Sequence, residues 1–245
     1  MSTLETRKIE PLSGTTVTLG AAGDAVTMPA GVTVKTNTVK DAGGNTIWTS
    51  NGSGTLSSVN SALTGNMIFI SSQTANFTST IDFESGIDST YDEYVFYFIN
   101  MHPSAASADW RFQVNATDGA DYNDSLITST FFYVAQSEGG TVEQSPPGYQ
   151  TSYDLAQSAN FQPMNENVGG DTDESLAGEL HLFTPSNTTY MKQFYTIVHS
   201  YRSDNYAHTG YVAGYVNDTT AIDEIRFKMA SGTIESGTIA MYGIL

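Results

Sequence analysis

The stretch 221–245 reads AIDEIRFKMASGTIESGTIAMYGIL and decides the fold class. Apolar residues recur in both of its halves: Ile222, Ile225, Phe227 and Met229, then Ile234, Ile239, Met241, Ile244 and Leu245. A Ser-Gly pair at 231–232 separates the halves, and the second half alternates as a strand with one buried face requires. We therefore expect two strands joined by a tight turn. Because a free end frays unless a sheet holds it, the apolar ending indicates that the last strand is central or well covered.

The composition predicts an all-β protein with one large or two modest domains. Thr, Ser, Gly and Asn are abundant among the 245 residues, whereas Lys, Arg, Glu and Leu are scarce. The chain has no cysteine, which excludes disulfides and cysteine-ligated zinc. The densest apolar run is only of strand length, so we expect no membrane insertion. The first residues also lack the apolar region of a signal peptide.

The charge is unevenly distributed along the chain. The protein has 26 acidic and 9 basic residues, and four of each fall before residue 67. Residues 67–245 therefore hold 22 acids against 5 bases and carry the whole net charge of −17. Nucleic acid requires a basic surface, so we expect no nucleic-acid binding. Such an acidic surface favours solubility, with cation binding or a basic partner as alternatives.

Residues 1–66 carry short β-like triplets between turn-forming clusters. The triplets lie at 17–19, 26–28, 32–34 and 46–48, separated by clusters such as KDAGGN. Large apolar side chains are too few here to close a monomeric core. Repeated units that cannot bury themselves alone point to several intertwined copies, with plain disorder as the alternative. We expect a homotrimeric shaft over 1–66, ending in a flexible joint at 51–61.

Residues 67–245 are predicted to form a jelly-roll-like β-sandwich of about eleven short strands with almost no helical period. The run 94–100, YVFYFIN, suits a central strand buried on both faces. Besides the two terminal strands, we expect strands at 67–70, 77–83, 94–100, 110–114, 130–135, 149–154, 178–183, 193–199 and 210–216.

Several groups of residues resemble bacteriophage virion proteins, above all tail fibres and related appendages. They are Ser231-Gly232-Thr233-Ile234, Gly237-Thr238-Ile239, Tyr242-Gly243-Ile244, the segment IDSTYDEYVFYFINMHP at 87–103 and the segment ELHLFTP at 179–185. The resemblance covers about residues 77–245, and 1–66 is similar to fibre shafts in composition. It implies a trimeric, non-enzymatic virion component, assembled in the host cytoplasm, with a distal domain that often binds sugar. It supplies no assured ligand residues.

Catalytic motifs are absent from the sequence. His102, His181, His199 and His208 show no metal-ligand spacing such as HExxH, and there is no Gly-x-Ser-x-Gly elbow, P-loop or GxGxxG. Two suitably separated carboxylates can hydrolyse a glycoside, but the sequence identifies no such pair. We expect neither enzymatic activity nor a cofactor. A polysaccharide depolymerase is an alternative.

Two acidic loops are candidates for calcium, because calcium binds oxygen-rich loops. Neither has the EF-hand spacing, so turns with solvated charges are the competing interpretation. The candidate ligands are Asp118, Asp121, Asp124, Asp171, Asp173 and Glu174.

Two tyrosine-rich stretches are candidates for sugar binding, because an aromatic face stacks on a sugar ring while acids and amides bond its hydroxyls. Packing of these tyrosines within the sandwich is the competing interpretation. The candidate residues are Tyr201, Asp204, Asn205, Tyr206, His208 and Tyr211 in the first stretch, and Tyr149 and Tyr153 in the second.

The sequence therefore favours a trimeric phage tail fibre or related appendage. Residues 1–66 are expected to join other tail or capsid proteins, and 67–245 to recognise a host surface glycan through avidity. A head fibre, capsid decoration or tail adaptor with a purely structural role is the first alternative.

Overall fold

The structure is a computed structural model and describes residues 36–52, 56–59, 67–116, 121–122, 125–140 and 142–245. The chain divides into two compact units, residues 1–60 and 61–245. All fifteen strands lie within these described residues, where no helix occurs and hence none that is long and apolar enough to cross a membrane. The protein is therefore all-β, as its composition predicts.

The first unit contains a small antiparallel sheet of β1 (Thr38–Lys40), β2 (Thr46–Ser50) and β3 (Leu56–Val59), in that order. The β1–β2 turn is closed by Asp41, whose carboxylate accepts hydrogen bonds from the backbone and side chain of Asn45 at 2.8 and 3.0 Å. The predicted strand at 46–48 is confirmed as part of β2.

The predicted flexible joint at 51–61 is wrong in part, because β3 lies inside it and Leu56 pairs with Ser50. The predicted triplets at 17–19, 26–28 and 32–34, and most of the expected shaft, lie outside the described residues.

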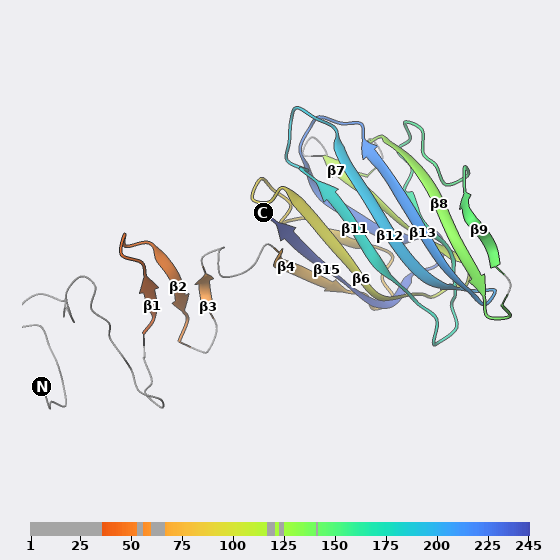
Figure 1. Cartoon of the computed structure of the whole chain (residues 1–245), viewed down its shortest axis with the longest axis horizontal. Coiled ribbons are helices and arrows are strands. Elements are labelled where there is room, and N and C mark those ends of the chain that lie inside the picture. Colours follow the sequence, from red (N-terminus) through yellow and green to blue (C-terminus); the bar gives the residue numbers. More distant parts are fainter. Residues whose placement is uncertain (1–35, 53–55, 60–66, 117–120, 123–124, 141) are drawn as a thin grey trace, which may run out of the picture. The chain divides into compact units, whose positions relative to one another are not determined.

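The second unit is a β-sandwich-like body in which antiparallel strands form two layers (Figure 1). The layers are linked where β10 meets β12, at the pair Val168 and Arg202. The front sheet has the order β4 (Met67–Thr74), β15 (Ile234–Ile244), β6 (Glu93–Pro103), β11 (Leu176–Phe183), β12 (Lys192–Arg202), β13 (Tyr206–Val216), β8 (Ile127–Ser137) and β9 (Val142–Tyr149). The back sheet has the order β10 (Gln162–Val168), β7 (Ala108–Ala116), β14 (Ile222–Met229) and β5 (Ile81–Phe83).

Aromatic side chains fill the space between the two sheets. Phe98 of the front sheet packs on Trp110 and Phe227 of the back sheet, with ring centroids 5.6 and 5.3 Å apart. Phe194 of the front sheet meets Phe112 of the back sheet at 5.1 Å. All five side chains are at most 2% exposed. Each strand contributes alternate residues to this core, so the other half of every front strand points outward.

The terminal stretch forms β14 and β15, as expected, but the two strands belong to different sheets and do not pair with each other. The turn between them passes through Gly232, whose φ of 70° suits glycine. Gly237 lies at a register shift in β15 with φ of 115°, and a Cβ there would stand 2.6 Å from the carbonyl oxygen of Asn100. β15 lies between β4 and β6, so it is an interior strand.

Three other strand predictions need correction. The segment 94–100 lies in the interior strand β6, but it is not buried on both faces, because Ile99 is 49% exposed. The strand expected at 77–83 is reduced to β5, with an isolated bridge at Thr78. The strand expected at 149–154 is wrong, because β9 ends at Tyr149 and a turn follows. The remaining strands expected between 67 and 216 all occur, most of them longer than predicted.

Candidate functional site

The outer face of the front sheet carries a row of side chains at successive cross-strand positions, all of them large except the first, an alanine. Such a row forms when strands pair in register, because paired residues point to the same face. From β15 to β9 the row consists of Ala240, Tyr97, Glu179, Ile197, Tyr211, Phe132 and Tyr149. Exposed apolar residues of this extent mark an interaction surface more often than a bare solvent face.

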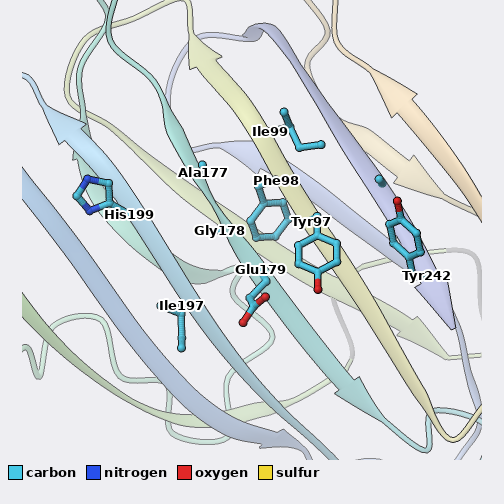
Figure 2. A pocket seen from close by; sticks show the side chains of 10 residues that line it. Tyr97, Phe98, Ile99, Ala177, Gly178, Glu179, Ile197, His199 and Tyr242 are labelled. Atoms are coloured by element: carbon cyan, nitrogen blue, oxygen red, sulfur yellow. The ribbon is translucent and has the colours of Figure 1, made fainter. Parts of the chain in front are cut away.

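A pocket of about 510 Å³, here called the front-face pocket, lies in this face across β15, β6, β11 and β12 (Figure 2). The hollow arises because Ala177, Gly178 and Ala240 have small or no side chains and larger ones surround them. No larger residue fits in place of Gly178, since a Cβ there would clash with the carbonyl oxygen of Ile197. The lining residues are Tyr97, Phe98, Ile99, Ala177, Gly178, Glu179, Ile197, His199, Ala240 and Tyr242.

Aromatic rings form one wall of the front-face pocket. Tyr97 and Tyr242 meet edge to face with centroids 5.7 Å apart, and Phe69 continues the series at 5.5 Å from Tyr242. Because interlocked rings restrict each other's rotamers, the wall is preorganised before any ligand arrives.

Three polar residues line the pocket on neighbouring strands, Tyr97 on β6, Glu179 on β11 and His199 on β12 (Figure 2). Burial, followed by the charge of Glu179, raises the pKa of the Tyr97 phenol, which therefore stays protonated and can donate a hydrogen bond. Burial also lowers the pKa of His199, and its Nδ1 lies 3.0 Å from the hydroxyl of Thr209. At neutral pH the pocket thus offers a phenol, a neutral imidazole and the Glu179 carboxylate.

On the same face of β11, the Glu179 carboxylate has His181 as its neighbour. The Nε2 of His181 lies 3.4 Å from Glu179, its Nδ1 contacts Glu93, and its ring stacks on Tyr195 at 4.4 Å. The Glu179 side chain lies next to the Tyr97 wall, because Glu179 and Tyr97 are direct cross-strand partners.

Such an arrangement suits a ligand with an apolar face and several hydroxyl groups. A volume of this size lies in the range of small-ligand sites, which combine apolar walls with a few directed polar groups. A sugar ring meets that description, since its C–H face stacks on tyrosine and its hydroxyls reach the carboxylate and imidazole.

The predicted sugar-binding residues are dispersed rather than gathered in this pocket. Tyr211 and Tyr149 lie on the same outer face, flanking Phe132, on which Tyr211 stacks at 5.0 Å. The Tyr149 hydroxyl donates a hydrogen bond to Asp154. These two therefore extend the surface on the far side of Ile197.

The β12–β13 hairpin brings together the middle part of the first predicted stretch, but it uses those polar groups internally. Arg202 forms a fork with Asp204, with contacts of 3.0 and 2.7 Å, and its guanidinium lies over the Tyr206 ring at 5.1 Å. The Tyr201 hydroxyl donates a hydrogen bond of 3.2 Å to Asn205. This hairpin is therefore a closed structural turn.

His208 and Tyr153 face inward or toward the other sheet. His208 is fully buried, 3.5 Å from Glu166, and stacks on Tyr133. The Tyr153 hydroxyl donates to Asp109 at 3.0 Å, and its ring packs on Phe131. His208 is therefore out of reach of any ligand in this conformation.

The two calcium candidates contain no cluster of three or more ligating side chains within the described residues. Asp118 and Asp124 lie outside those residues, and Asp121 is the described member of the first group. In the second group the Glu174 carboxylate accepts a 2.8 Å hydrogen bond from the backbone of Asp171. The Glu174 carboxylate therefore stabilises the 171–174 turn through this hydrogen bond.

The sequence analysis missed Tyr97, Tyr242 and Glu179 as site residues. The sequence predicts Tyr97 and Tyr242 as strand and motif residues, because it does not reveal the order of the strands. The alternation of the sequence does indicate that both tyrosines point outward, because each follows or precedes a residue that is buried, Phe96 beside Tyr97 and Met241 beside Tyr242.

Comparison with known proteins found no family model, no curated protein and no solved structure that matches this chain.

Proposed function

We propose that the second unit is a non-enzymatic carbohydrate-binding module of jelly-roll type, carried by a trimeric bacteriophage appendage for host attachment. The observation that supports binding is the front-face pocket, where the Tyr97–Tyr242 wall faces the Glu179 carboxylate over a hollow of about 510 Å³. The phage setting and the trimeric shaft rest on the resemblance of the terminal motifs and on the composition of 1–66.

The pocket favours a neutral sugar. Glu179 accepts hydrogen bonds from sugar hydroxyls but repels a carboxylate or phosphate, and the surrounding unit is strongly acidic. Binding at a single such site is weak, and three copies on one stalk raise the avidity by orders of magnitude.

The test is a titration of the full chain with neutral host-type oligosaccharides, in parallel with two variants. Tyr97→Ala removes the stacking wall and is expected to weaken binding about tenfold or more. Tyr190→Ala is the matched control, because Tyr190 is 70% exposed outside the pocket, and it should bind as the unchanged protein does. Failure of every neutral glycan to bind at high protein concentration, or equal affinity of both variants, would refute the proposal.

A purely structural role is the second candidate, and the exposed apolar residues of the front face favour it. Ile99, Phe132 and Ile197 are 49%, 41% and 38% exposed, and Phe69 is 56% exposed. In this case the face packs against another protein of the particle. A purely structural role predicts that no glycan binds. It also predicts that a particle reconstruction shows density from a neighbouring protein over β6, β11 and β12.

A further inference from the structure

A second pocket, of about 460 Å³, opens on the outer side of the back sheet. Its floor comes from β7, β10 and β14, and the segment 152–161 covers one side. We call it the loop pocket. The lining residues are Arg111, Tyr122, Ser152, Tyr153, Leu155, Ala159, Asn160, Phe161, Pro163 and Lys228.

The loop pocket concentrates positive charge in an acidic unit. Residues 67–245 hold five basic residues against 22 acidic ones, yet two of the five, Arg111 and Lys228, line this pocket. No carboxylate is among its described lining residues. Arg111 and Lys228 are direct cross-strand partners, an arrangement that destabilises a sheet when the two charges are alike. An anion between them would remove that repulsion.

The two cations differ in how far they are neutralised. One Arg111 nitrogen, Nη2, donates to Asp109 at 2.7 Å, and Asp109 also accepts from Tyr153. Lys228 has no carboxylate within 4.0 Å among the described residues, and its Nζ lies over the Phe161 ring, 4.7 Å from the centroid. Its ammonium is therefore the charge available to a ligand.

The wall formed by residues 159–161 is fixed in place by Gln113. The Gln113 side-chain amide is buried and donates to the carbonyl oxygens of Ala159 and Asn160, each within 3.3 Å. This anchor holds Phe161 beside Lys228, so aromatic faces and the positive charge are presented together without rearrangement.

We propose that the loop pocket binds a sugar bearing a carboxylate, such as a hexuronate. Lys228 binds the carboxylate, and Arg111 contributes a second positive charge. Hydrogen bonds from lysine and arginine to a carboxylate are stronger than hydrogen bonds between neutral groups. The ring lies against Phe161 and Tyr153, and the Asn160 amide and Ser152 hydroxyl bond its hydroxyls. This site belongs to the opposite sheet from the front-face pocket and differs from it in charge, so it stands or fails independently.

The test measures binding of methyl glucuronide and of its uncharged methyl ester to the full chain by calorimetry or ligand-observed NMR. The carboxylate form should bind about tenfold more tightly than the ester. Lys228→Met should remove that preference, and Lys228→Arg should retain it. Lys40→Met is the matched control, because it removes one exposed positive charge from the other unit, and it should leave the preference unchanged.

Four outcomes would overturn the proposal. The first two are equal affinity for the acid and the ester, and no binding of the acid up to about 20 mM. The third is that Lys40→Met loses the preference for the acid as Lys228→Met does. The fourth is that Tyr97→Ala no longer binds the acid, which would locate the bound acid on the front face. Tighter Lys228-dependent binding of glucose 6-phosphate than of the glucuronide would overturn the assignment of a carboxylate.

Discussion

Replacing Glu166 by glutamine tests the buried charges where β10, β12 and β13 meet. Glu166 is 7% exposed, and its Oε1 lies 3.5 Å from both Arg202 Nη1 and His208 Nε2. Glutamine keeps the size of the side chain and removes its charge. Arg202 keeps its fork with Asp204 in the variant, whereas the fully buried His208 loses its carboxylate.

The loss of stability in Glu166→Gln depends on which of its two partners is left without a compensating carboxylate. Removing one member of a buried ion pair costs about 3–5 kcal/mol when the other is left uncompensated. Because Asp204 still neutralises Arg202, we expect about 2–3 kcal/mol, at the lower end of that range or below it. For a unit of this size that corresponds to a drop in Tm of roughly 4–12 °C.

The cost should depend on pH. Burial alone would raise the pKa of Glu166, but the neighbouring His208, followed by the charge of Arg202, outweighs burial and holds this pKa below its ordinary value. A folded-state pKa below the unfolded value means that this contribution is present above about pH 4.5 and is lost as pH falls through the folded-state pKa. The difference between the two proteins should therefore narrow in acid.

Urea denaturation of the full chain at pH 7 and at about pH 3.5 measures both effects. Glu84→Gln, at an exposed carboxylate, is the control and should change stability by no more than about 0.5 kcal/mol. A cost for Glu166→Gln below about 1 kcal/mol at pH 7, or a cost that is the same at both pH values, would refute this account of the cluster.

Two further predictions concern the core. Phe227→Ala should destabilise the protein by about 3–5 kcal/mol, because this buried ring touches aromatic rings of both sheets. Phe132→Ala, on the outer face, is the control and should cost less than about 1 kcal/mol. If urea denaturation gave similar costs for the two variants, the assignment of Phe227 to the core and Phe132 to the outer face would be wrong. Burial raises the pKa of Tyr94 to about 12 and also raises those of Tyr122 and Tyr153, with help from neighbouring carboxylates. Since the unfolded chain loses these protons first, stability should fall as pH rises above 10, and a single phenolate transition near the ordinary value in an ultraviolet titration would argue against burial.

Hydrophobic alternation predicts most strands of the second unit but not β10. The strand predicted at 193–199 is confirmed within β12, where residues alternate between buried and exposed along its length. β10 was missed because its buried side chains include Gln162, Asn165 and Glu166. Their burial depends on partners elsewhere in the fold, such as Ser129 for Gln162 and Val198 for Asn165. A pattern of apolar residues cannot reveal a strand stabilised by buried polar groups.

The front-face pocket was beyond reach of the sequence because strand order creates it. Tyr97, Glu179 and Tyr242 are far apart in the chain and become neighbours through the order β15-β6-β11. The sequence instead favours the stretch 201–211, because it combines tyrosines with acids, amides and a histidine around a predicted loop. That loop proved to be a tight hairpin whose Arg202 and Asp204 bind each other. Composition and motif identify residue types, and topology decides which of them meet.

The charge of the front face favours the sugar that we propose over a second protein copy as its occupant. Glu179 lies in the middle of the exposed row, and each copy of the chain carries a net charge of −17. Packing this face against its own copy would desolvate Glu179 next to another acidic surface, and removing a carboxylate from water costs several kcal/mol unless a partner compensates it. A sugar hydroxyl donates to the carboxylate and leaves it partly hydrated. In the trimer that we propose, copies associate through residues 1–66, where acids and bases balance, and the front face is not needed for that association.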